Sequence, residues 1–390
     1  MKKYKLSDLC DVFGRIGFRG YTVNDLVAKG EGAITFSPSD INNFTLSYDN
    51  CTYISLYKYE ESPEIKVFNG NIIFTKTGSS IGKTAYVENL TEKATINPQF
   101  VVLKNFKCNG KYLFYILTSK WFQKSVWNIV VGSTVPTMSQ EDFKKREVYL
   151  PERHIQDQVA SALSTLDKRI ENLRAQNRVL EQTAKTIYDY TFLQCAGHQT
   201  TYNKTLNRNI PAGWEVKKLS EIANITMGQS PEGSSYNEIG NGKIFYQGCT
   251  DFGVMFPTPR LYTTAPTRFA KVNDILMSVR APVGTLNIAN TECCIGRGLA
   301  ALNAKEGSNV FLYYVMKNFE NHFKNAFSMG TTFGSITKND LYDLPVLFPD
   351  SKTLELFSMQ VSPLFKKQLV NSQQIETLTT QRNTLLPLLM

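Results

Sequence analysis

A glycine-containing segment at residues 76–84, KTGSSIGKT, comes close to the pattern of a phosphate-binding loop. That pattern, G-x-x-x-x-G-K-[ST], cradles phosphates with backbone N–H groups and would need glycine at position 77. Thr77 stands there instead, and Gly78 is one residue too close to Gly82. We therefore expect no nucleotide site, and we interpret the segment as a turn that presents lysine and hydroxyl groups to a ligand.

A second short segment, Asn97-Pro98-Gln99-Phe100, differs by one letter from the N-P-P-[YF] motif of amino-methyltransferases. Such an enzyme also needs a glycine-rich cofactor loop after a strand, and the sequence contains no such motif. We therefore interpret these four residues as a turn that leads into a strand over residues 100–103.

Carboxylates, histidines and cysteines with the spacing of metal ligands are scarce. Asp40 with Glu64 and Lys66 resembles the arrangement of metal-dependent nucleases, in which two carboxylates hold Mg²⁺ and an attacking water, but the second half of the chain has no counterpart. The three His residues lie far apart, and the seven Cys residues include no C-x-x-C. We expect no metal site, no disulfide framework, no catalytic residue and a cytoplasmic protein.

The chain contains an internal repeat with an offset near 199 residues. A period of this length is too long for a solenoid and indicates two copies of one module. The matching segments, in order, are 5–9 and 218–222, 71–75 and 274–278, 112–117 and 311–316, 132–134 and 330–332, 139–143 and 337–341, and 147–151 and 345–349.

Each copy has the same predicted layout. About 150 residues alternate short strand-like runs with turn signals, such as Asn69-Gly70 and Asn109-Gly110. A helix-like stretch follows late in each copy, at 110–130 and 308–328, and a long polar helix comes after it.

The first long helix, which begins after Pro151, has apolar residues at alternating steps of four and three. This spacing predicts a coiled-coil seam rather than the wider apolar face of an ordinary amphipathic helix. Asn177 interrupts the seam, and one polar residue there typically fixes the register. At about 1.5 Å per residue, the stretch 155–187 would be about 50 Å long.

The last segment of the chain is the expected partner helix, although its seam is interrupted by Gln368, Asn371 and Arg382. Ser362-Pro363 has the form of an N-cap followed by proline at the first helical position, which predicts either a new helix or a kink there. The expected interface between the two helices consists of Leu163, Leu166, Ile170, Leu173, Asn177, Leu180, Val361, Leu364, Ile375 and Leu378.

The predicted fold class is therefore α+β. Two similar mixed α/β domains are separated by two long helices that form an antiparallel coiled coil. The expected segments are a first domain at 1–150, a first long helix at 151–194, a linker at 195–210, a second domain at 211–349 and a second long helix at 350–390.

The formal net charge of +9 is shared by both halves of the chain. Residues 1–195 carry 25 Lys/Arg against 20 Asp/Glu, and the remaining residues carry 18 against 14. A basic balance favours an acidic partner, of which nucleic acid is the commonest. No apolar run approaches the ~18 residues of a membrane span, and no signal peptide is visible.

Several segments resemble motifs of the specificity subunits of type I restriction–modification systems. Residues 210–219, IPAGWEVKKL, are similar to the opening motif of the family's target-recognition domains. Residues 274–280, followed by Val283-Gly284, resemble its central strand and turn, and residues 70–82 hold the same place in the first copy. Leu150-Pro151 and the following residues 155–160 look like the lead into the family's first conserved helix.

The resemblance covers the whole chain in the order domain, helix, domain, helix. It departs from the family in the first copy, which lacks the Pro-x-Gly-Trp opening, and in Ala281-Pro282, which replaces Gly78-Ser79-Ser80.

The resemblance implies a non-catalytic, DNA-binding protein without a cofactor of its own. Each module would read one half of a split, asymmetric sequence in double-stranded DNA. The helices would set the unread spacer and dock two methyltransferase subunits, which methylate adenine with S-adenosylmethionine. Restriction subunits with motor and nuclease activity, using ATP and Mg²⁺, would join them, and no membrane is involved.

Polar loops with basic groups supply the candidate DNA contacts, because Lys and Arg neutralise phosphates while Arg, Asn, Gln, Ser and Thr read base edges. We regard Gln247 and Arg280 as the best candidates for base contacts. The candidates are Arg15, Arg19, Lys76, Thr77, Ser79, Ser80, Lys83, Ser133 and Thr134 in the first copy, and Gln229, Ser230, Tyr246, Gln247, Arg280, Arg297, Thr331, Thr332 and Lys338 in the second.

Two other classes of protein remain as alternatives. A catalytic nuclease or DNA methyltransferase with a fused recognition module would need a catalytic domain, for which the duplicated layout leaves no room. A scaffold that binds proteins through its two modules conflicts with the basic charge of both halves. The salt dependence of DNA binding would separate the scaffold from a DNA reader.

Overall fold

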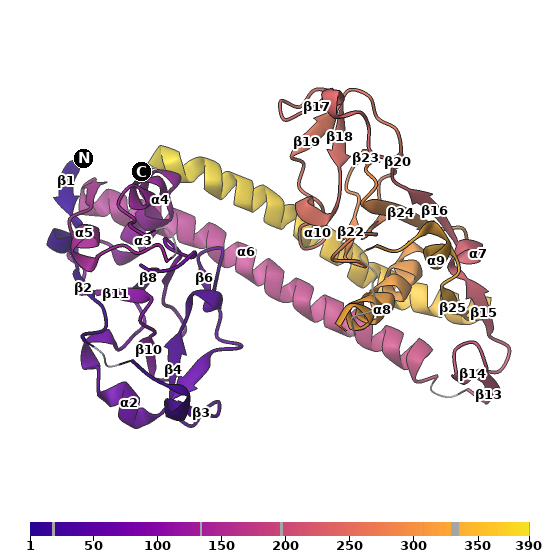
Figure 1. The fold of residues 1–390 in the computed structure, drawn as a ribbon, viewed down its shortest axis with the longest axis horizontal. Coiled ribbons are helices and arrows are strands. Elements are labelled where there is room, and N and C mark those ends of the chain that lie inside the picture. Colours follow the sequence, from indigo (N-terminus) through magenta and orange to yellow (C-terminus); the bar gives the residue numbers. More distant parts are fainter. Residues whose placement is uncertain (18–19, 133–134, 196–197, 307, 329–334, 390) are drawn as a thin grey trace. The chain divides into compact units, whose positions relative to one another are not determined.

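The computed structural model describes the chain except for residues 18–19, 133–134, 196–197, 307, 329–334 and 390. Within helices it also leaves out the side chains of 321–322, 324–328 and 389. Its internal contacts divide the chain into two units (Figure 1). The first unit contains Met1–Arg169 and Leu378–Met390, and the second contains Ile170–Thr377. Each of the two long helices contributes one part to each unit.

The first unit contains two four-stranded sheets. One is antiparallel, in the order β2-β11-β8-β9, and the other has the order β10-β4-β7-β3. Strands β1 and β12 pair, as do β5 and β6. The elements are β1 (Lys2–Lys5), α1 (Leu6–Leu9), β2 (Asp11–Phe13), β3 (Leu26–Val27), β4 (Ala33–Phe36), β5 (Ile41–Asn42), β6 (Thr45–Leu46), β7 (Thr52–Ile54), α2 (Leu56–Glu60), β8 (Ile72–Thr75), β9 (Thr84–Tyr86), β10 (Ala94–Ile96), β11 (Phe100–Lys104), α3 (Gly110–Thr118), α4 (Lys120–Trp127), α5 (Gln140–Lys144) and β12 (Glu147–Leu150).

The second unit repeats this plan. Its antiparallel sheet has the order β16-β24-β21-β22, and its other sheet has the order β17-β19-β18-β23-β20. The elements are β13 (Thr200–Asn203), β14 (Arg208–Pro211), β15 (Glu215–Lys218), α7 (Leu219–Ile222), β16 (Ala223–Met227), β17 (Tyr236–Asn237), β18 (Lys243–Tyr246), β19 (Leu261–Thr263), β20 (Phe269–Ala270), β21 (Ile275–Ser278), β22 (Leu286–Ile288), β23 (Cys293–Ile295), β24 (Leu299–Ala304), α8 (Asn309–Ser328), α9 (Lys338–Tyr342) and β25 (Pro345–Phe348).

The internal repeat predicted from the sequence is confirmed at the level of strand pairing. Each unit has a parallel pair of short strands, β4 with β10 and β18 with β23. The backbone bond that follows this pair recurs as well, from Asn97 N to Phe36 O (3.0 Å) and from Gly296 N to Tyr246 O (2.8 Å). The α+β fold class is likewise confirmed.

The helices predicted at 110–130 and 308–328 are present, the first as two pieces. Ser119 separates α3 from α4, because its hydroxyl accepts a hydrogen bond from Phe122 N (3.2 Å) and so caps the second piece. Residues 112–117 of α3 are all buried in the core of the first unit. Residues 195–210, expected as a linker, contain β13 and most of the partner strand β14.

The two long helices are α6 (Arg153–Tyr188), which continues as a π-helical turn (Asp189–Leu193), and α10 (Ser351–Leu389). No new helix begins at Pro363, because α10 is continuous through that residue. A proline inside a helix removes one backbone hydrogen bond and crowds the carbonyl of the residue four positions earlier, but the 39-residue helix α10 includes Pro363 without a break. Among the described residues, no helix is both long and apolar enough to cross a membrane.

In the second unit, the polar residues that interrupt the apolar seam pair with one another. Asn177 Nδ2 donates to Ser372 Oγ (3.1 Å), and Asn371 Nδ2 donates to Asn177 Oδ1 (3.0 Å). One turn farther along α6, Glu181 accepts from Gln368 Nε2 (3.1 Å). Moving along α6 from Asn177 to Glu181, the partner in α10 changes from Asn371 back to Gln368, so the two helices run antiparallel in this unit.

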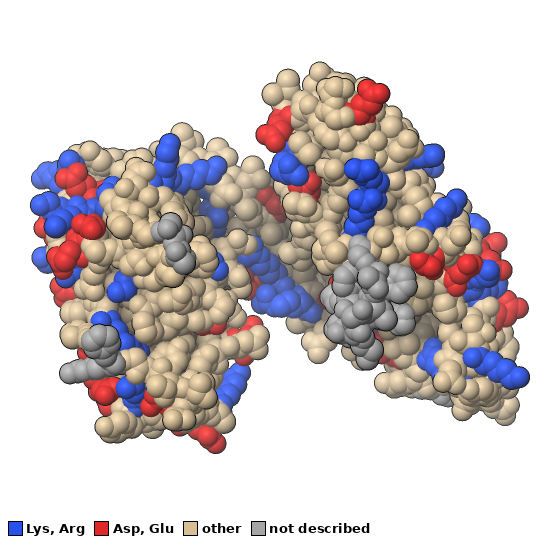
Figure 2. Space-filling view, viewed as in Figure 1, with Lys and Arg blue, Asp and Glu red and all other residues tan. Residues whose placement is uncertain are grey.

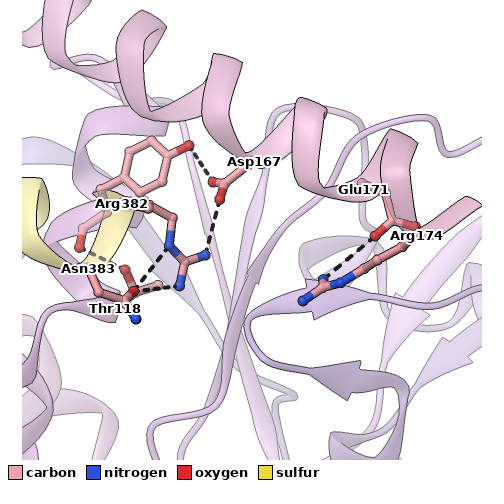
Figure 3. Close-up of polar contacts among 7 residues, drawn as sticks. Thr118, Asp167, Glu171, Arg174, Arg382 and Asn383 are labelled. Atoms are coloured by element: carbon pink, nitrogen blue, oxygen red, sulfur yellow. Dashed lines mark hydrogen bonds and ion pairs between the residues drawn. The ribbon is translucent and has the colours of Figure 1, made fainter. Parts of the chain in front are cut away.

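In the first unit, the end of α10 is tied to the domain by one carboxylate (Figure 3). Asp167 on α6 accepts from Arg382 Nη1 (3.0 Å) and from the hydroxyl of Tyr115 on α3 (2.7 Å). Burial and the neighbouring carboxylate of Asp167 raise the pKa of Tyr115, so this hydroxyl stays a donor at neutral pH. Arg382, which looks like a defect of the seam in the sequence, is therefore an anchoring residue.

We expect the substitution Asn177→Ala to lower the free energy of unfolding by about 1–3 kcal/mol, because it leaves polar atoms of buried Asn371 and Ser372 without their partners. Urea unfolding, followed by circular dichroism, measures the change. The control is Asn172→Ala at an exposed position of the same helix, which should change the stability by less than about 0.5 kcal/mol. Equal effects of the two substitutions would contradict a register role for Asn177.

Candidate nucleic-acid interface

The turn at residues 76–83 in the first unit connects β8 to β9 in an antiparallel hairpin. A phosphate-binding loop needs a helix after it, so this topology excludes that motif and confirms the turn. The Nζ of Lys83 donates to the carbonyl of Pro38 (3.0 Å). Lys76 is half-buried, and burial lowers its pKa. Ser79 is exposed and Ser80 is partly buried on the same turn.

Two further candidates of the first unit can be placed. Thr77 pairs with Thr137 in an isolated antiparallel bridge. Arg15 donates from Nη2 to the carbonyl of Ile96 (3.1 Å), and burial lowers the pKa of its guanidinium. Arg15 therefore supports the end of β10 as well as being a candidate contact. Arg19, Ser133, Thr134, Thr331 and Thr332 lie outside the described residues.

The equivalent turn of the second unit carries Arg280. This residue forms an isolated antiparallel bridge with Ser335, which matches the bridge of Thr77 in the first unit. The flanking bonds match too, from Lys76 N to Gln99 O (2.7 Å) and from Val279 N to Gly298 O (2.9 Å). The repeat therefore assigns Arg280 to the position of Thr77.

Arg280 lies beside a pocket of about 230 Å³ in the second unit. The pocket forms where the loops after β18 and β23 meet the turn after β21. It brings together three of the candidates chosen from the sequence, Gln247, Arg280 and Arg297, all with exposed side chains. The lining residues are Gln247, Gly248, Cys249, Thr250, Asp251, Arg260, Arg280, Ala281, Arg297 and Gly298.

The backbone of the pocket is held tightly. The amide of Gly298 donates to Gln247 O (3.2 Å), and a Cβ on Gly298 would lie only 2.6 Å from that oxygen. The amide of Arg297 donates to Ser230 Oγ (3.3 Å). These contacts position the loops while the guanidinium of Arg297 remains exposed.

Sequence reasoning missed one pair in this pocket. The buried carboxylate of Asp251 accepts from Arg260 Nε (2.7 Å) and Nη2 (3.3 Å), and this ion pair raises the pKa of Arg260. The available signal was the repeat, because Asp251 and Asp40 both end a short 3₁₀ helix that follows the equivalent strands β18 and β4. Arg260 has no such signal, since a loop brings it back to Asp251.

Tyr246 is not a surface residue, and the prediction that it contacts DNA is wrong. Its side chain is fully buried in a core cluster, and its hydroxyl donates to the carbonyl of Pro257 (3.3 Å). The error has a local cause, because β18 ends with two adjacent buried residues, Phe245 and Tyr246, and the exposed Gln247 comes directly after them.

The remaining candidates of the second unit lie apart from the lining of the pocket. Gln229 is exposed, and Ser230 uses its hydroxyl to hold Arg297. Lys338 lies on α9, where its Nζ lies over the ring of Tyr342, 5.0 Å from the ring centroid. Figure 2 shows one face of the molecule, on which Lys and Arg side chains lie singly or in small groups among uncharged surface.

The nuclease-like triplet has structural partners instead of a common site. The carboxylate of Asp40 accepts from the backbone amide of Ser37 (2.7 Å). Lys66 forms an ion pair with Glu60. Within the described residues, no group of three or more His, Cys, Asp or Glu side chains is placed to hold a metal ion. Asn97 Oδ1 accepts from Gln99 N (3.0 Å), which confirms the turn before β11.

The expected helix interface is spread over several environments. Leu163 lies in the core of the first unit and Val361 in the core of the second. Ile170 and Leu173 are buried, and Asn177 pairs with α10. The partly buried members of the set are Leu166, Leu180, Leu364, Ile375 and Leu378.

Comparison with known proteins agrees with the duplicated architecture. The family model of the type I restriction modification DNA specificity domain matches residues 1–182 and again residues 211–380. The chain belongs to this family. It is therefore a type I restriction–modification specificity subunit with two DNA-recognition domains. Each match includes one globular domain and most of the long helix that follows it.

Two relatives come from Methanocaldococcus jannaschii. The putative type I restriction enzyme MjaX specificity subunit is 31% identical over 337 residues, which cover 83% of this chain and 79% of the relative. The MjaIX specificity subunit is 25% identical over 372 residues, covering 90% and 84%. The crystal structure of a type I S subunit from M. genitalium shares the fold, with a TM-score of 0.64 at 17% identity, and the match covers 100% of this chain and 96% of that one.

We expect Tyr246→Phe to leave the DNA sequence recognised by the specificity subunit unchanged and to lower the free energy of unfolding by about 0.5–1.5 kcal/mol, because only the bond to Pro257 is lost. Tyr246→Ala should cost about 3–5 kcal/mol through the cavity it leaves. Urea unfolding and sequencing of methylated DNA measure the two effects. A changed target sequence in Tyr246→Phe would restore Tyr246 as a DNA contact.

Proposed function

We propose that each domain of this specificity subunit reads one half of a bipartite, asymmetric sequence in double-stranded DNA. The observation that carries the proposal is the duplicated scaffold with different side chains at matching positions. Arg280 occupies the place of Thr77, and Arg297 the place of Pro98. Two copies of one scaffold with different surface chemistry fit two different half-sites.

In this proposal the chain supplies recognition, and its partners supply chemistry. Two methyltransferase subunits dock on the long helices and methylate adenine with S-adenosylmethionine. Restriction subunits, which need ATP and Mg²⁺, join them to cut unmodified DNA. Linking two modest recognition modules raises the overall affinity through effective concentration, so neither half-site needs tight binding alone.

The long helices set the unread spacer between the half-sites. A helix rises about 1.5 Å per residue, so seven residues correspond to about 10 Å, or roughly three base pairs of B-DNA. The polar pairs of Asn177 and Asp167 fix which residues of α6 and α10 face each other. The spacing is thus a consequence of helix length and register.

The first experiment is co-expression of the chain with its cognate methyltransferase subunit in a host that lacks adenine methylation. Sequencing of the modified bases should give a split, asymmetric motif. The control is the methyltransferase subunit alone, which should modify nothing at that motif. Cleavage or methylation of DNA by this chain without partners would support the catalytic alternative. DNA binding that does not change with salt concentration would support a scaffold that binds proteins.

We expect deletion of one heptad from each long helix, residues 169–175 and 374–380, to shorten the spacer by about three base pairs and leave both half-sites unchanged. These heptads lie between the polar pairs, so both pairs are retained. The methylated motif is again the measurement. Deletion of residues 169–175 alone is the control, because it shifts the register and should abolish modification. An unchanged spacer in the double deletion would refute the proposal.

A further inference from the structure

We infer that the pocket of the second domain, residues 247–251 with Arg260, Arg280 and Arg297, reads guanine in the half-site of that domain. The inference rests on the proposed function and specifies its chemistry. Of the described lining residues, three are Arg and one is acidic. The pocket therefore has an excess of two positive charges, which suits an electron-rich partner.

The three guanidinium groups are not equivalent. Asp251 engages Arg260 with two bonds, so that fork is already occupied. Arg280 and Arg297 have exposed side chains, and among the described residues neither guanidinium has an ion-pair partner. Both forks are thus available to a ligand.

The base edge that matches a free guanidinium is the major-groove edge of guanine. Its O6 and N7 atoms both accept hydrogen bonds at a spacing that one Arg fork spans. Gln247, on the rim of the same pocket, carries an amide that can donate and accept at a neighbouring adenine. The backbone of each loop is fixed, through Ser230 at Arg297 and through the bridge to Ser335 at Arg280. Fixed backbones with free side-chain ends favour base reading over loose attraction to phosphates.

The first domain lacks this chemistry at the matching positions. The repeat assigns Ser37 to Gln247, Thr77 to Arg280 and Pro98 to Arg297. None of these side chains has a guanidinium fork. Guanine reading by this pocket is therefore a property of the second domain, and it makes the two half-sites chemically different.

The test uses the assembled methyltransferase complex and an unmodified DNA duplex that carries the motif found by the co-expression experiment. Arg280→Ala and Arg297→Ala should each relax the motif at a guanine of the same half-site, and discrimination at that position should fall about fivefold or more. Arg297→Lys, which keeps the charge but loses the fork, should relax the same position. The controls are Arg268→Ala, at an exposed arginine of the second domain outside the pocket, and Lys76→Ala in the first domain. Neither control should alter that half-site.

A modified base separates base reading from phosphate binding. Replacing the guanine by 7-deazaguanine removes N7 and leaves the phosphates unchanged. It should weaken binding by the wild-type complex and have little further effect on the arginine variant that reads that base. A loss of affinity that is uniform over all DNA sequences, with a slope of log K against log salt concentration smaller by about one, would show a phosphate contact. That result would overturn the inference. A half-site without guanine would overturn it as well. In both cases the bipartite motif would survive, whereas its absence in the wild type would refute the proposed function itself.

Discussion

The parallel pairing of two short strands decides which loops of each domain lie together. In a parallel pair the carboxyl ends of both strands lie at the same edge, so the loops that follow them meet. Strands β18 and β23 pair in this way, and the loops after them contribute Gln247 and Arg297 to one pocket. The antiparallel sheet adds Arg280 from the turn after β21. If β18 and β23 were antiparallel, Gln247 and Arg297 would lie at opposite ends of their sheet.

The long helices depend on a different constraint, the pairing of polar groups inside an apolar seam. A purely apolar seam tolerates sliding by one heptad, because every heptad presents the same surface. Asn177 with Asn371, and Asp167 with Arg382, remove that freedom, since a slipped register would leave buried Asn371 and three partly buried side chains without these partners. These pairs lower the stability of the seam but define one register, which the proposed reading of two half-sites at a fixed spacing requires.

The sequence predicted the features that depend on local periodicity and on duplication. The heptad spacing located α6, and the repeat located equivalent strands, because side-chain pattern and burial are linked within each element. The features that depend on tertiary contacts were missed. Proline often ends a helix, yet α10 continues through Pro363. The residues around it, such as Val361 and Phe365, pack in the core of the second unit. Tyr246 looked suitable for recognition by its type, and only the direction of its side chain shows that it is a core residue.

The division between backbone and side chain shows how one scaffold could read two different half-sites, as we propose. The loops around the pocket of the second unit and the matching loops of the first unit are held by equivalent backbone hydrogen bonds, from Val279 N to Gly298 O and from Lys76 N to Gln99 O. These bonds do not depend on the side chains at positions 77 and 280, so threonine and arginine can occupy equivalent places in the same frame. Substitution at such positions changes the chemistry offered to a base and removes little packing from the core. If each domain reads its own half-site, as we propose, substitutions at such positions change the target at a small loss of stability, and the two copies can read different sequences.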